Sequence, residues 1–111
     1  MPNIKGNERN KRIIASKKQE GSKLTLALEG RIDTLTAPQL ESEISPMLEG
    51  IDALVIDLAQ VAYISSAGLR VLLSTHKKML AAGGALTIAN AVPAVREVFD
   101  ITGFSDILTL A

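Results

Sequence analysis

Strand-like and helix-like apolar patterns alternate along this chain, and this alternation restricts the folds that it can adopt. Residues 53–58 form a short, nearly unbroken apolar run, which is typical of a strand covered on both faces. A helical pattern follows it, with apolar residues at Leu69, Leu72, Leu73, Met79 and Leu80. Strands that alternate with helices in this way indicate βαβ units and a parallel or mixed sheet.

The other predicted strands are short. Residues 13–18 and 23–29 predict two strands around a turn at residues 20–22, and leucines at alternate positions of the second indicate a half-buried strand. Residues 30–33 break that alternation. Residues 86–89 and 107–110 predict two further strands.

Two more helices are predicted from their ends. Thr36 and Gln39 have the spacing of a capping box, and Pro46 predicts a kink or an early end of the helix that they start. Residues 92–99 predict another helix, which Gly103 caps. We therefore predict one α/β domain, a mixed sheet of four or five strands with three or four helices packed mainly on one face.

Length and composition fit a single core without covalent cross-links. The chain has 111 residues, of which 47% are hydrophobic. Cysteine is absent, so disulfides, thiolate metal sites and cysteine nucleophiles are excluded. The longest apolar runs are far too short to span a bilayer, and residues 1–20 lack the apolar stretch of a secretory signal. We expect a soluble, cytoplasmic protein without membrane insertion.

Charge is spread unevenly, although the formal net charge is zero. Residues 1–20 hold six Lys or Arg against two Glu, a net charge of +4, which leaves −4 on residues 21–111. We interpret the basic residues 1–20 as solvated charge at a frayed terminus rather than as an arm that binds nucleic acid. The negative net charge of residues 21–111 also argues against nucleic acid as a direct partner. We expect residues 1–10 to be a disordered lead-in or a remnant of cloning, and residues 11–111 to be the domain.

The loops that follow the carboxyl ends of the strands are the expected functional positions in such a sheet. These are residues 30–36, 60–66 and 89–92. In the second loop, Ser65 and Ser66 stand at a helix start, where the first backbone N–H groups lack partners. A serine there can cap the helix, and the same N–H groups and the helix dipole can hold a phosphate. Spacing alone favours capping over phosphorylation.

Other polar residues have ordinary interpretations. Asp57 is either a buried carboxylate with a shifted pKa or, as we prefer, an acceptor for neighbouring backbone N–H groups. A serine hydrolase would need His76, the only histidine, as the base for Ser66, but ten residues along one helix is about 15 Å, far beyond hydrogen-bond reach. No glycine-rich phosphate motif and no metal-ligand cluster is found, so we predict no cofactor and no metal.

Six segments match one family pattern in order: residues 28–33 (LEGRID), 36–38 (TAP), 54–57 (LVID), 63–73 (YISSAGLRVLL), 83–86 (GGAL) and 95–104 (VREVFDITGF). Together they resemble the STAS domain, the family of bacterial anti-sigma factor antagonists. The resemblance runs from about residue 11 to the C-terminus. It implies a single STAS-type domain and a protein-binding function, with no catalysis by this chain.

The resemblance also implies a regulatory cycle. Such a protein binds an anti-sigma factor that is a serine kinase, and so frees the sigma factor; the kinase then phosphorylates the antagonist with ATP, and a serine phosphatase reverses this. In the family the target serine precedes a small residue, Gly and Leu, which match Ala67, Gly68 and Leu69. The implied phosphoacceptor is Ser66, with Ser65 as the second candidate.

The partner surface that the resemblance implies is formed by two loops, with Arg31, Asp33, Thr34, Ser65, Ser66, Ala67, Gly68 and Leu69 as its residues. For Asp33 we weigh a contact with the partner equally against a turn in which its side chain bonds nearby backbone. Many phosphorylated members have Asp before the target serine, whereas this chain has Ser65, so kinase recognition is expected to differ. The alternative functions are a STAS subunit of a transport or stress-sensing complex and a small serine-dependent hydrolase.

Overall fold

The computed structural model describes residues 13–111, and the predicted lead-in at residues 1–10 lies outside them. The described part begins with a hairpin of two antiparallel strands, β2 (Ile14–Glu20) and β3 (Lys23–Ile32). Glu20 pairs with Lys23, so the connection has two residues, and Gly21 adopts a φ of 63° there. Glycine reaches this left-handed conformation at no steric cost, which explains its place in the turn.

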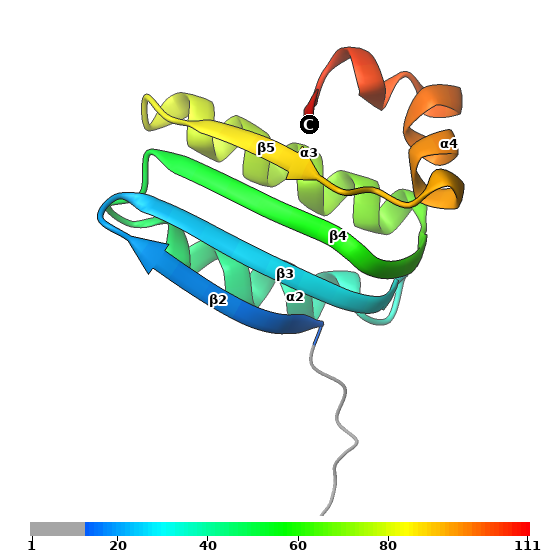
Figure 1. Cartoon of the computed structure of the whole chain (residues 1–111), viewed down its shortest axis with the longest axis horizontal. Coiled ribbons are helices and arrows are strands. Elements are labelled where there is room, and N and C mark those ends of the chain that lie inside the picture. The colour runs from blue at the N-terminus through cyan, green and yellow to red at the C-terminus, as the bar shows by residue number, and fades with distance from the viewer. Residues whose placement is uncertain (1–12) are drawn as a thin grey trace, which may run out of the picture.

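Three parallel strands complete a mixed sheet of five: β4 (Ala53–Ile64), β5 (Ala85–Ala89) and β6 (Thr109–Leu110). The strand order follows the chain, and the parallel connections pass through the helices α2 (Ala37–Ile44), α3 (Ser66–Ala81) and α4 (Pro93–Thr102). Figure 1 shows α2 and α3 side by side behind the sheet, and α4 near the carboxyl end of β5. The predicted single α/β domain with a mixed sheet and helices mainly on one face is confirmed.

The core lies between the sheet and the helices. Leu26 and Ile56 are paired neighbours on β3 and β4 and are fully buried, as is Leu72 on α3. The intervening residues of β4, such as Val55, are only half-buried. The expectation that residues 53–58 form a strand covered on both faces is therefore wrong, because α2 and α3 cover one face of the sheet.

Both central strands are longer than predicted. Residues 60–64, expected to be a loop, belong to β4, and residues 30–32, expected to break the pattern, belong to β3. The pairing of the two strands shifts twice, and each shift leaves one extra residue on β4. Such bulges shift the alternation of buried and exposed side chains, so that Leu58, Val61 and Ile64 are buried at intervals of three. A search for apolar residues at every second position therefore misses this part of the strand. The preferred interpretation of Asp57 is confirmed, since its Oδ1 accepts from the Ala59 N–H at 2.9 Å, next to a bulge.

Helix ends agree with the sequence in part. The predicted capping box is wrong: Thr36 makes no side-chain cap bond, and the Gln39 amide donates to Glu43 instead. An early end of α2 is confirmed, because a 3₁₀ turn, η1 (Ser45–Leu48), replaces the α-helix where Pro46 stands. Gly103 ends α4 with a φ of 82°, as predicted. The last strand is shorter than residues 107–110, since a second 3₁₀ turn, η2 (Phe104–Asp106), precedes it.

No helix within residues 13–111 combines the length and apolarity needed to cross a membrane.

Candidate functional site

The candidate site lies where β3 and β4 end beside each other. Ile32 and Ile64 are paired at the last position of the two parallel strands, and the Ser65 N–H donates to the Ile32 carbonyl at 2.8 Å. The loop after β3 and the start of α3 are therefore adjacent, as the sequence predicts. Parallel strands bring their carboxyl ends to one edge of the sheet, which is where ligands and partners meet such folds.

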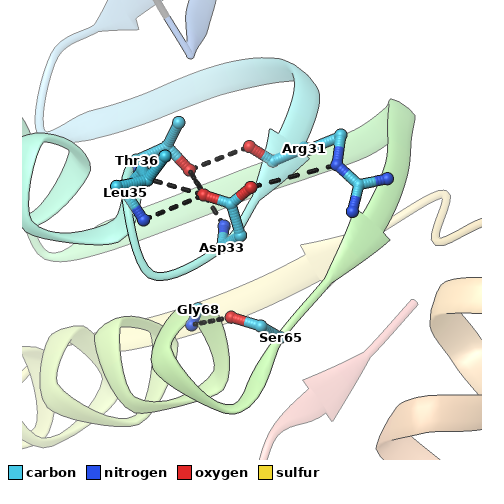
Figure 2. Close-up of polar contacts among 6 residues, drawn as sticks. All are labelled: Arg31, Asp33, Leu35, Thr36, Ser65 and Gly68. Carbon is cyan, nitrogen blue, oxygen red and sulfur yellow. Dashed lines mark hydrogen bonds and ion pairs between the residues drawn. The ribbon is translucent and has the colours of Figure 1, made fainter.

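Asp33 organises the loop after β3. Its Oδ1 accepts from the backbone N–H groups of Leu35 at 3.0 Å and of Thr36 at 3.1 Å (Figure 2). In return the Asp33 N–H donates to the Thr36 Oγ1 at 2.9 Å, and that hydroxyl donates to the Arg31 carbonyl at 2.9 Å. The turn alternative for Asp33 is confirmed. These donors, with the nearby Arg31 charge, lower the pKa of the Asp33 carboxyl below its ordinary value of 3.8.

Arg31 joins the two strand ends on the surface. Its Nε lies 3.9 Å from the Asp33 Oδ2, and its guanidinium carbon lies 4.3 Å from the centre of the Tyr63 ring. Arg31 and Tyr63 are paired residues of β3 and β4, so the cation–π contact runs across the sheet. All three groups are at least partly exposed, so these contacts orient the surface more than they stabilise the fold.

The two serines at the start of α3 have different environments. Ser65 is the N-cap, with extended backbone at φ −97° and ψ 177°, and its Oγ accepts from the Gly68 N–H at 3.4 Å (Figure 2). Ser66 is the first residue of the helix and is exposed. Its hydroxyl makes no hydrogen bond to any residue of the described part of the chain. Capping is thus assigned to Ser65, and the Ser66 hydroxyl has no structural role among the described residues.

Gly68 and Leu69 lie beneath this surface. Both are buried, and a Cβ added to Gly68 would lie 2.7 Å from the Ile32 Cγ2 and 2.7 Å from the Ile64 Cγ1. The absence of a side chain at Gly68 lets α3 begin against the ends of β3 and β4. These two residues, which were expected to contact a partner, instead position the residues that are exposed.

The remaining predicted site residues lie at the surface. Thr34 is exposed in the Asp33 loop, and Ala67 is half-buried in the first turn of α3. Sequence reasoning missed Leu35, which is 87% exposed between Thr34 and Thr36. A leucine between two threonines in a loop was the available signal, because it belongs to neither of the apolar periodicities.

The geometry does not assemble a hydrolase. Ser66 and His76 lie on the same helix, ten residues and about 15 Å apart. The Nδ1 of His76 is buried and has no hydrogen-bond partner among residues 13–111. A serine and its base must be within hydrogen-bond reach, so His76 cannot activate Ser66 in this fold.

Comparison with known proteins identifies the family. The model of the STAS domain matches residues 14–111. The Bordetella bronchiseptica protein BtrV, provisionally named an anti-sigma factor antagonist, is 40% identical over 89 residues, which cover 79% of this chain and 77% of that protein. The anti-sigma-B factor antagonist of Bacillus subtilis is 34% identical over 94 residues, covering 85% and 86%. An anti-sigma factor antagonist from Mycobacterium paratuberculosis has a crystal structure that matches with a TM-score of 0.76 and 30% identity, covering 86% and 81%. The chain therefore belongs to the STAS domain family.

Proposed function

We propose that this chain is an anti-sigma factor antagonist, which binds an anti-sigma factor serine kinase and is released when that kinase phosphorylates Ser66. The observation that carries the proposal is that the two serines have different roles at the start of α3. Ser65 caps α3, so the exposed Ser66 hydroxyl is available for modification without loss of the cap. Relatives that cover most of this chain carry the antagonist name.

A phosphate on Ser66 suits the start of a helix. The first N–H groups of α3 and the positive end of its dipole favour an anion at that position. Ala67 follows with a minimal side chain, which leaves room for a kinase active site. Ser66 is thus both accessible to the enzyme and able to hold the product.

The partner surface in this proposal consists of the exposed and half-buried residues around Ser66. Arg31, Asp33 and Thr34 come from the first loop, and Ser65 and Ala67 flank the phosphorylation site. The Asp33 hydrogen bonds hold the first loop in one conformation, which reduces the entropy that binding would otherwise cost. A phosphate adds about 1.5 to 2 negative charges, and its repulsion and desolvation in a packed interface cost a few kcal/mol, enough to release the partner.

The cycle also needs a cytoplasmic setting with ATP and a serine phosphatase that restores the hydroxyl. The experiment is to incubate the chain with ATP and a candidate anti-sigma factor serine kinase, and to measure intact mass. We expect the mass of one phosphate to appear on the wild type and on Ser65→Ala, but not on Ser66→Ala. Phosphate transfer to Ser65 in the wild type would make the capping serine the phosphoacceptor and contradict the proposal.

Binding tests the second half of the cycle. Ser66→Asp is expected to bind the kinase at least about tenfold more weakly than wild type, because the added charge lies in the interface. Ser66→Asn is the matched control of equal size without the charge, and it should bind nearly as well as wild type. Equal affinity of Ser66→Asp and wild type would favour a STAS subunit of a larger assembly, in which Ser66 does not act as a switch.

A further inference from the structure

A groove of about 720 Å³ lies between α2 and α3. Its lining includes Thr34, which belongs to the loop after β3, and Ala67, which follows Ser66 in the chain. Two hydrogen bonds join α3 to the segment formed by α2 and η1: the Ser74 hydroxyl donates to the Glu41 Oε2 at 3.1 Å, and the Lys78 Nζ donates to the Ser45 Oγ of η1 at 2.7 Å. These bonds occupy the only carboxylate of its lining and one of its cations.

Two other cations of the groove have no such partner among residues 13–111. Arg70 and Lys77 line it from α3, and neither forms an ion pair within residues 13–111. They stand seven residues apart, which places them on one side of the helix about 10 Å from each other. Residues 21–111 carry six Lys or Arg and a net charge of −4, yet three of those six cations line this groove. The groove is therefore a positive strip on an otherwise acidic body.

We propose that the groove between α2 and α3 receives an acidic segment of the partner protein, with Arg70 and Lys77 as its contacts. This inference rests on the proposed function and extends its interface from the strand ends along α3. Small and apolar residues, such as Ala37, Val71 and Leu73, line the groove between the charges and fit the backbone and apolar side chains of a polypeptide. The narrow positive strip and the acidic surroundings disfavour a nucleic acid, which needs a broader basic face.

The same geometry couples the groove to Ser66. Arg70 follows Ser66 by four residues on α3, so the two side chains are neighbours on the helix surface. A phosphate on Ser66 can accept charge-assisted hydrogen bonds from the Arg70 guanidinium. It then withdraws Arg70 from the acidic segment, and the phosphate weakens binding by competition within this chain as well as by repulsion of the partner.

A partner-independent titration tests the groove. The ¹⁵N-labelled full chain is titrated with hexaglutamate, and amide shifts are followed by NMR. We expect shifts along the facing sides of α2 and α3, and an affinity at least about fivefold lower in the double variant Arg70→Gln, Lys77→Gln. The matched double variant Lys17→Gln, Lys23→Gln removes the same charge from exposed positions on β2 and β3 and should bind like wild type.

Three outcomes would overturn the inference: shifts that centre elsewhere or are absent, equal losses in the two double variants, or tighter binding of hexathymidylate at the same groove. None of them depends on the kinase, so they leave the phosphate-transfer test of Ser66 unaffected. The coupling has its own readout, the second pKa of phosphoserine 66 measured by ³¹P NMR. It should lie lower in the wild type than in Arg70→Gln, and equal values would refute the competition.

Discussion

Replacing Ser65 by alanine removes the side-chain cap of α3 and leaves every other contact of the helix start in place. The cap is one hydrogen bond, from the Gly68 N–H to the Ser65 Oγ at 3.4 Å. Loss of a serine cap costs about 0.5 to 2 kcal/mol of the free energy of unfolding. Because 3.4 Å is longer than the usual N–H···O separation, we expect the lower part of that range, about 0.5 to 1 kcal/mol.

Ser66→Ala is the matched control, since it deletes the same atom at the next residue. The Ser66 hydroxyl is exposed and makes no hydrogen bond within residues 13–111, and alanine has the higher helix propensity. The free energy of unfolding should therefore change by less than about 0.5 kcal/mol, in either direction. The two variants should therefore differ in stability although they have the same composition.

Urea unfolding followed by far-ultraviolet circular dichroism measures both variants against wild type. The midpoint of Ser65→Ala should fall with an unchanged m-value, which indicates a loss of stability without a change in the surface exposed on unfolding. A loss of 1 kcal/mol would lower Tm by about 4 to 8 °C in a domain near this size. Equal losses in the two variants, or a larger loss in Ser66→Ala, would refute the assignment of the cap to Ser65.

Two further predictions concern the frame around the serines. Gly68→Ala should lower the free energy of unfolding by up to about 2 kcal/mol, because its Cβ would meet Ile32 and Ile64 at 2.7 Å. This overpacking outweighs the gain in helix propensity. Thermal unfolding measures the change, and a rise in Tm would contradict the prediction. Asp33 has a lowered pKa, so its carboxylate stabilises the folded state fully above pH 3.8 and loses this effect as the pH falls through the lower folded value. The stability difference between wild type and Asp33→Ala should accordingly shrink below pH 3.8 in urea titrations, and a constant difference would show that the charge has no part in the turn.

Local patterns in the sequence were enough to identify the elements and the position of the site. Leucines at alternate positions of residues 23–29 mark a strand, and the apolar spacing from Leu69 to Leu80 marks α3. Both patterns arise from burial of one face, which acts along the chain within a few residues. The family segments around the serines then placed the candidate site at the edge where β3 and β4 end.

Contacts between distant segments decided what the patterns missed. The extra residues of β4 exist only in its pairing with β3, so their bulges shift the buried positions without a local signal. Thr36 has the spacing of a cap, yet its hydroxyl is used by Asp33 and Arg31 in the loop before the helix. Two adjacent serines are equivalent as sequence, and only the docking of α3 on the strand ends makes one the cap.

The helix start around Gly68 shows which features follow from the sequence alone and which require the tertiary structure. The sequence by itself determined an α/β domain and a serine-rich helix start, because periodicity and terminal residues act over one or two turns. The tertiary structure decided that Gly68 and Leu69 lie beneath the site while Ser66 stays exposed, because the side chains of Ile32 and Ile64 occupy the space beside the helix. It also decided that Arg70 and Lys77 share a groove with α2, because β4 separates the two helices in the chain and its parallel pairing with β3 brings both onto the same face of the sheet.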